Sequence, residues 1–204
     1  SDNIGDGGID GTSYSVTISG NTIENNKVGR YSSYDGSFSV DGEGGGINGS
    51  GQILNNVIKG NIARDGGGIA GGGTVTGNTI IGNTATEKGG GIYVGYGGNT
   101  ISDNYILNNT GGSIYVRDAH LPITGNIIEG TLYYEHRGDS KNDVGKVTGN
   151  MIYNGNLTLR GTRLTDHVYD DQGNSSVVYY VGLEVKNNTI NGYVSIQGSV
   201  VFNN

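Results

Sequence analysis

The sequence predicts an all-β protein, a solenoid in which each repeat makes one turn and pairs its strands in parallel with those of the next turn. Three observations predict this class. Gly and Asn supply 41 and 25 of the 204 residues, and both disfavour helices. The apolar residues are mostly β-branched and stand in segments too short to be helices. A six-residue motif recurs seven times along the chain.

Composition excludes several other classes. Gly follows no three-residue frame and there is only one Pro, which excludes a collagen helix. The net charge of −7 predicts no nucleic-acid partner, because phosphates attract clustered Lys and Arg. The chain has no Cys for disulfides or thiolate metal sites, and no apolar run of about 20 residues for direct membrane insertion. A Cys-free, acidic, polar chain suits an exposed, secreted protein.

The recurring motif has the form [Ile/Val]-x-[Gly/Asn/Asp]-Asn-x-Ile. Its first residues should stack inward as one apolar column: Ile18, Ile53, Val75, Ile101, Ile123, Val147 and Val185. Its last residues should form a second column: Ile23, Ile58, Ile80, Ile106, Ile128, Ile152 and Ile190. Between them we expect an asparagine ladder at a sharp corner, where Asn tolerates the left-handed conformation and amides bond from turn to turn: Asn21, Asn56, Asn78, Asn104, Asn126, Asn150 and Asn188.

A second motif sets the period. Gly-Gly-Gly-Ile occurs at 44–47, 66–69 and 89–92, and Gly-Gly-Ser-Ile follows at 111–114, so the spacings are 22, 23 and 22. We expect about nine turns of roughly 22 residues in a single domain, residues 1–204. This domain would have an N-terminal turn or cap at 1–17, repeats at 18–196, and inserted loops at 27–41, 135–146 and 161–182. The open ends should pack against neighbouring repeats or domains, as in a piece of a longer protein.

These repeats resemble the right-handed parallel β-helix repeats of the pectate-lyase-like superfamily. The form Asn-x-Ile-x-x-Asn followed by Gly-Gly-Gly-Ile is most similar to repeats in adhesin-like surface proteins of bacteria and archaea. The resemblance covers about residues 18–196 and implies a right-handed parallel β-helix that is extracellular or on the cell surface. It also implies a role with polysaccharides. Lyases of the superfamily use an Arg or Lys base with acidic residues that hold Ca²⁺, and its hydrolases use clustered Asp.

The strands after the glycine motif carry the candidate binding face. If Ile92, Ile114, Leu132 and Leu157 point inward, alternation makes Tyr93, Tyr115 and Tyr133 outward neighbours. The next outward column contains Arg117, Glu135 and Arg160. Such a surface suits sugar rings, which pack on aromatic side chains while their hydroxyls meet charged groups. Without a ligand, the same residues would form an aromatic and ion-pair ladder that only stabilises the sheet.

We therefore predict an adhesin-type module that binds a polysaccharide or a host or cell-surface glycan. The first alternative is a polysaccharide lyase or glycoside hydrolase, with Arg117, Glu135, Arg160 and Asp118 as its catalytic candidates. Glu135 and Asp118 are its only candidate carboxylate pair, whereas a glycosidase needs two carboxylates flanking the scissile bond. Weaker alternatives are a structural stalk or an ice-binding face built on Ser19, Leu54, Thr76, Ser102, Thr124, Thr148 and Lys186.

Metal ions and histidines carry weaker signals. No cofactor is required, although Asp170, Asp171 and Asn174 are candidate Ca²⁺ ligands. Two further acidic sets are Asp2, Asp6 and Asp10, and Asp35, Asp41 and Glu43. Acidic residues in turns are more often simply solvated. We expect the three histidines, His120, His136 and His167, to be exposed loop residues.

Overall fold

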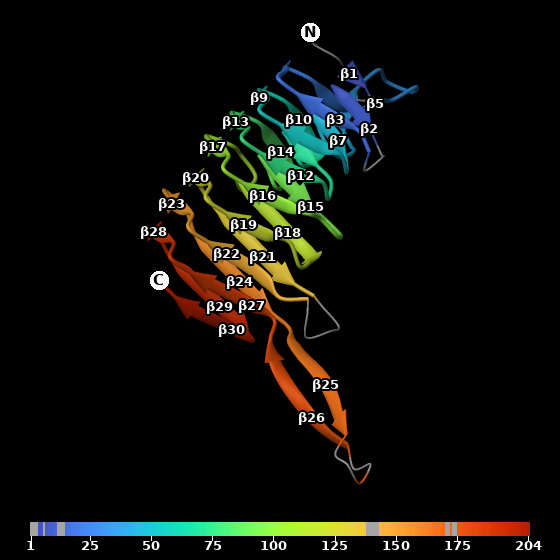
Figure 1. The fold of residues 1–204 in the computed structure, drawn as a ribbon. Coiled ribbons are helices and arrows are strands. Elements are labelled where there is room, and N and C mark those ends of the chain that lie inside the picture. The colour runs from blue at the N-terminus through green and yellow to red at the C-terminus, as the bar shows by residue number, and fades with distance from the viewer. Residues whose placement is uncertain (1–3, 6, 12–14, 138–142, 170–171, 173–174) are drawn as a thin grey trace.

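The computed structural model describes residues 4–5, 7–11, 15–137, 143–169, 172 and 175–204 (Figure 1). The described residues form strands and turns without an α-helix, and almost all strand pairs are parallel. The predicted class, an all-β parallel β-helix, is confirmed. Two sheets have eight strands each, which mark eight stacked turns, close to the number expected from the period.

Four parallel sheets run along the stack. The first turns visit sheets B, C, D and A in that order, and the turns after β14 have strands in B, C and D only. Sheet B contains β2 (Ile9–Gly11), β7 (Ile47–Gly49), β11 (Ile69–Ala70), β15 (Ile92–Val94), β18 (Ile114–Ala119), β21 (Leu132–His136), β24 (Leu157–Gly161) and β29 (Val194–Gly198). Sheet C contains β3 (Thr17–Ser19), β8 (Gln52–Leu54), β12 (Thr74–Thr76), β16 (Thr100–Ser102), β19 (Pro122–Thr124), β22 (Gly145–Thr148), β27 (Leu183–Lys186) and β30 (Val200–Asn203).

The other two sheets are shorter. Sheet D contains β4 (Thr22–Glu24), β9 (Val57–Lys59), β13 (Thr79–Ile81), β17 (Tyr105–Leu107), β20 (Ile127–Glu129), β23 (Met151–Tyr153) and β28 (Thr189–Asn191). Sheet A contains β1 (Ile4–Gly5), β5 (Lys27–Tyr31), β10 (Ile62–Asp65) and β14 (Thr84–Lys88), and β6 (Phe38–Val40) pairs antiparallel with β5. A separate antiparallel hairpin, β25 (Arg163–Tyr169) and β26 (Ser175–Val181), projects from the stack (Figure 1).

The core consists of the two predicted apolar columns and the inward residues of sheet B. In the middle of the stack Ile53 pairs with Val75, and Ile58 with Ile80, each at most 1% exposed. Burial of each such side chain contributes about 1.5–3 kcal/mol. The predicted inward direction of both columns is confirmed, except that Ile190, near the C-terminal end, is only partly buried.

The asparagine ladder is present at the corner between sheets C and D. The backbone N–H and the side-chain amide of Asn104 both donate to Asn126 Oδ1, at 3.0 and 2.9 Å. The same amide donates to the Val75 carbonyl at 2.9 Å. The left-handed conformation falls one residue earlier than we predicted, for example at Asp103, whose φ is 55°. This explains why the third motif position is restricted to Gly, Asn and Asp.

A second asparagine ladder lies five residues further along, between sheets D and A. It contains Asn26, Asn61, Asn83 and Asn109, and Asn61 donates to Asn83 Oδ1 through both its backbone N–H and its side-chain amide. The ladder stops at Asn109, because Thr131, five residues after Asn126, replaces the Asn that the earlier turns have at this position. Sheet A stops at the same level with β14. The turn from Ile114 to Leu132 accordingly needs only 18 residues, whereas the turn before it has 22.

Candidate ligand-binding face

The outer face of sheet B carries a column of three tyrosines. Tyr93 pairs with Tyr115, and Tyr115 with Tyr133, on three adjacent parallel strands, as alternation predicts. The ring centroids of Tyr115 and Tyr133 are 4.4 Å apart with an interplanar angle of 7°. Those of Tyr93 and Tyr115 are 5.9 Å apart at 23°. The side chains therefore stack along the axis of the solenoid.

This stacking leaves the three rings unequal. Both faces of Tyr115 are turned toward other tyrosine rings. The second face of Tyr133 has the Arg160 guanidinium 5.7 Å from its centroid, within cation–π range. Among the described residues, no second ring stacks on the other side of Tyr93, because Ala70 stands there in register with only a methyl group. The column is thus a stack of rings that face one another, and Tyr93 is the ring with one face open.

The charged column lies two residues further along the strands. Arg117, Glu135 and Arg160 are in register on β18, β21 and β24. Tyr133 donates a 2.8 Å hydrogen bond to Glu135 Oε2, and Arg137 lies 3.7 Å from Glu135 Oε1. Burial and this hydrogen bond raise the pKa of Tyr133 above its usual value. Glu135 is therefore already engaged by protein groups.

A second charged column flanks the tyrosines on the side of sheet A, a position that the sequence did not predict for Glu43 or its neighbours. It contains Glu43, Asp65 and Lys88, the residue before each Gly-Gly-Gly-Ile. Lys88 Nζ lies 5.4 Å from the Tyr115 ring centroid. Burial, followed by the charges of Glu43 and Asp65, raises the pKa of Tyr93. The recurring charged residue before the glycines was the signal in the sequence that pointed to this column.

Arg64 connects the two acidic members of that column. Its guanidinium lies 3.0 Å from Asp65 Oδ2 and 3.7 Å from Glu43 Oε1. Asp65 is 5% exposed, and its Oδ1 has no hydrogen-bond partner among the described residues. Glu43 remains exposed and can offer carboxylate oxygens to a ligand.

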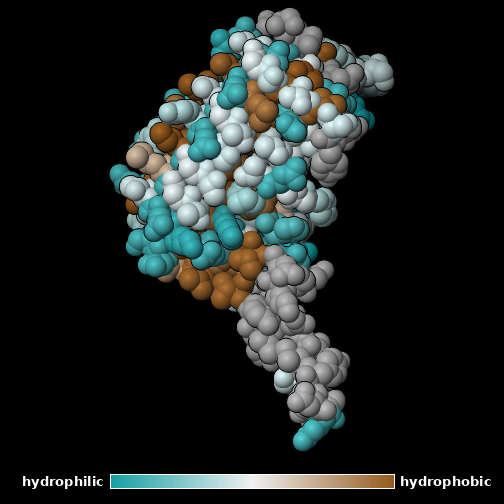
Figure 2. All heavy atoms as spheres, in the orientation of Figure 1, coloured by the Kyte–Doolittle hydropathy of each residue, from teal (hydrophilic) through white to brown (hydrophobic). Residues whose placement is uncertain are grey.

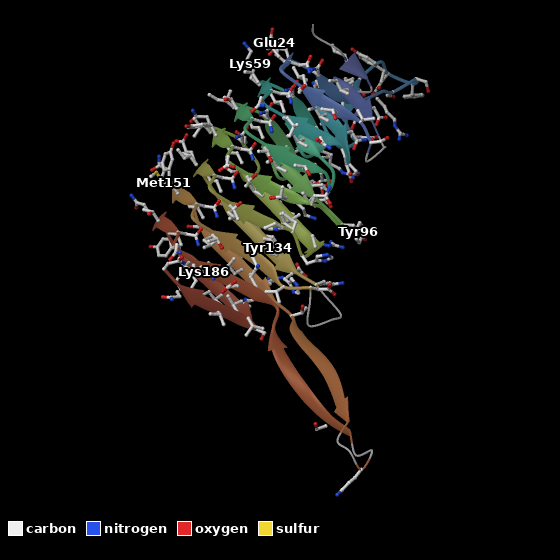
Figure 3. All side chains as sticks on the ribbon, in the orientation of Figure 1. Glu24, Lys59, Tyr96, Tyr134, Met151 and Lys186 are labelled. Carbon is white, nitrogen blue, oxygen red and sulfur yellow. The ribbon has the colours of Figure 1, made fainter. Side chains whose placement is uncertain are left out.

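A depression of about 310 Å³ lies beside Tyr93. Its lining combines one partly buried and one exposed aromatic ring, a carboxylate, a hydroxyl and three glycines: Tyr93, Tyr96, Glu43, Ser50, Gly71, Gly72 and Gly95. The volume is at the lower end of that found for small-molecule sites. The glycines leave the depression open because they have no side chain. For example, a Cβ at Gly95 would lie 3.2 Å from the Tyr93 hydroxyl. Tyr96, 75% exposed, stands out from the body beside it (Figure 3).

The remaining predicted positions do not add to this site. The side chain of Asp118, on β18, lies outside the described residues, as do Asp170, Asp171, Asn174, Asp2 and Asp6. Within the described part of the chain no three acidic or His side chains could hold a metal ion together. Asp35 instead accepts hydrogen bonds from the hydroxyl and the backbone N–H of Ser37, the main causes that lower its pKa to about 2. The proposed ice-binding column is in register on sheet C but is interrupted by Leu54 and Lys186.

His136 corrects one expectation. It lies on β21, fully buried, and not in an exposed loop. Its Nδ1 is 2.8 Å from Thr162 Oγ1, and its Nε2 contacts the Asp143 carbonyl. Burial is the main cause that lowers its pKa. His136 therefore joins the bases of two insertions to sheet B and is turned away from the outer face.

Comparisons with known proteins add no family assignment: no protein-family model, no curated protein and no solved structure matches this chain. Among the described residues, no helix is long and apolar enough to cross a membrane.

Proposed function

We propose that this chain is an adhesin-type β-helix module of the extracellular space or cell surface, and that it binds a glycan in the depression beside Tyr93. The observation that carries the proposal is the open side of the Tyr93 ring, bordered by Glu43 and Ser50. The apolar face of a sugar ring packs on an aromatic ring, and its hydroxyls donate to a carboxylate. The repeat form Asn-x-Ile-x-x-Asn, similar to that of adhesin-like proteins, supports the location.

The tyrosines divide into a binding and a structural part. Tyr93 makes the looser ring contact and borders the depression, so its removal should weaken binding more than folding. Tyr115 makes the tight 4.4 Å contact with Tyr133, so its removal should weaken folding, by about 0.5–1.5 kcal/mol beyond the lost burial. A column that served only the sheet would not show this division.

The test is a screen of neutral and acidic oligosaccharides, followed by calorimetric titration of the best ligand. Tyr93→Ala should weaken binding about tenfold or more, which corresponds to about 1.4 kcal/mol. Ser50→Trp, which puts a large side chain into the lining of the depression, should have a similar effect. The matched control is Tyr105→Ala, since Tyr105 is 53% exposed on sheet D, away from the depression. Equal losses in the control, or no ligand in the screen, would refute the proposal.

The same samples test the enzymatic alternative. Turnover of polyuronates or neutral polysaccharides that is lost in Arg117→Ala or Arg160→Ala would favour a lyase or hydrolase. Binding without turnover, lost in Tyr93→Ala, would favour the module proposed here.

A further inference from the structure

A positive charge accompanies two of the three stacked tyrosines. Lys88 Nζ lies 5.4 Å from the ring centroid of Tyr115, and the Arg160 guanidinium lies 5.7 Å from that of Tyr133. Both distances are within the range of cation–π attraction, in which a cation lies over the negative face of an aromatic ring. Among the described residues, no Lys or Arg stands over the Tyr93 ring in this way.

A carboxylate takes the place of the missing cation. Asp65 is in register with Lys88, one turn earlier in the stack. Tyr93 precedes Tyr115 by the same step. Tyr93 therefore has an acid at the register position from which Lys88 reaches its ring. Glu43, which bridges to Asp65 on the turn before, has the same sign of charge.

Arg64 neutralises these two carboxylates only in part. Its guanidinium is 3.0 Å from Asp65 Oδ2, whereas it is 3.7 Å from Glu43 Oε1. The buried Oδ1 of Asp65 has no hydrogen-bond partner among the described residues. The Glu43 side chain is 44% exposed and lines the depression beside Tyr93. Burial, followed by the charges of Glu43 and Asp65, raises the pKa of Tyr93, so both carboxylates act on this ring.

The linings of two neighbouring depressions have the same sign of charge. Glu43 is the only charged residue among the described residues that line the depression beside Tyr93. Glu43 also lines a second depression, of about 410 Å³, to which Asp10, Asp41 and Arg30 contribute the other charges. Arg30 lies 3.3 Å from Asp41 and pairs with it. Carboxylates therefore outnumber cations at both depressions, which attracts positively charged ligands.

We propose that the glycan bound beside Tyr93 contains an amino sugar with a free amino group, and that this ammonium group lies between the open face of the Tyr93 ring and the Glu43 carboxylate. The inference rests on the proposed function and adds the class of sugar to it. The ammonium group supplies the cation that the other two rings receive from the protein, and its N–H groups donate to Glu43.

Other ligand classes fit this surface less well. A uronic acid would bring a second carboxylate against Glu43, and such a contact between like charges is unfavourable. An N-acetylated sugar would leave the carboxylates beside Tyr93 without a cation. Over the middle of the body, the face shown in Figure 2 has mainly hydrophilic and intermediate side chains, which suits a hydrated ligand better than an apolar one.

The test compares two oligosaccharides of equal length: a glucosamine oligomer with protonated amines, and its N-acetylated counterpart. In calorimetric titration of the intact chain, the charged oligomer should bind about tenfold tighter or more. Glu43→Gln removes the charge but keeps the size of the side chain, so it should abolish this preference and change the affinity for the acetylated oligomer less than about twofold. The matched control, Glu184→Gln on β27 of sheet C, removes the same charge away from the depression and should keep the preference. Circular dichroism checks that each variant folds.

The outcomes separate this inference from the proposed function. Equal or tighter binding of the acetylated oligomer or of a polyuronate, lost in Tyr93→Ala, would overturn the amino-sugar assignment and leave the glycan site in place. A preference that survives in Glu43→Gln would overturn the assignment too. So would a preference that Glu184→Gln reduces equally, since that result indicates general attraction to an acidic protein. No binding of any oligosaccharide would overturn both.

Discussion

Removal of one asparagine from the middle of the ladder should destabilise the whole stack. In Asn104→Ala, the backbone N–H of Asn78 loses its 2.9 Å acceptor, and the Val75 carbonyl loses its 2.9 Å donor. Asn104 is 1% exposed, so water cannot replace these partners without a rearrangement. Each buried group left without a partner costs about 1–3 kcal/mol. The variant should therefore lose about 2–6 kcal/mol, with about 4 kcal/mol as the midpoint.

The measurement is equilibrium unfolding in urea, followed by far-ultraviolet circular dichroism. The matched control is Asn99→Ala, an exposed Asn outside the ladder, which should change stability by less than about 0.5 kcal/mol. Hydrogen exchange of β12 and β16 shows whether the loss is local, because neighbouring turns of a solenoid can unfold separately. A loss below about 1 kcal/mol in Asn104→Ala, with exchange unchanged, would show that the ladder is not a major source of stability.

Three further changes test other parts of the fold. Gly149 has a φ of 67°, and a Cβ there would make only an ordinary contact of 4.0 Å with the Gly125 nitrogen, so Gly149→Ala should cost about 1 kcal/mol in urea unfolding and Gly149→Asn clearly less. Tyr134→Phe removes the 2.7 Å hydrogen bond to the Leu121 carbonyl and should cost about 1–2 kcal/mol, measured in the same way. The lowered pKa of His136 means that the unfolded chain takes up its proton first, so its contribution to stability is complete above about pH 6.5 and declines below it. Urea midpoints at about pH 7.5 and about pH 5.5 should differ less in His136→Gln than in the wild type.

The fold was largely predictable because its signal is repeated. Isoleucines such as Ile53 and Ile58 recur at fixed separation, and only stacked turns bury both columns. The exact position of the left-handed residue was not predicted. Asp and Asn both tolerate this conformation, so propensity alone does not decide between Asp103 and Asn104. The loss of sheet A after β14 was also missed. The two apolar columns of the motif continue through the turns that lack sheet A, so their periodicity alone does not show that this sheet has ended.

The candidate site was predictable only in part, since alternation fixes the side of a strand and not the direction of a ring. It placed Tyr93, Tyr115 and Tyr133 on one outer face. It gave no information on side-chain torsions, and these turn the rings toward one another instead of toward solvent. The position of Glu43 and Lys88 beside the tyrosines was missed for a related reason. They lie before the glycines, and only the tight glycine corner brings them back beside the tyrosines.

The position of the depression follows from the change in the shape of the turn. Lys88 is the last residue of the last strand of sheet A, and it reaches over Tyr115, on the turn that follows. In the outer column Tyr115 and Tyr133 stack closely, and the next two positions are the smaller Thr158 and Ser195. Before Tyr93, the column holds small or polar residues such as Ala70 and Asn48. Tyr93 stands at this boundary, with a ring on one side and a methyl group on the other. At the other end of the tyrosine stack Tyr133 meets Thr158, but there the Arg160 guanidinium lies over the ring. We therefore expect a ligand to be recognised at the boundary beside Tyr93 and not along the regular repeat.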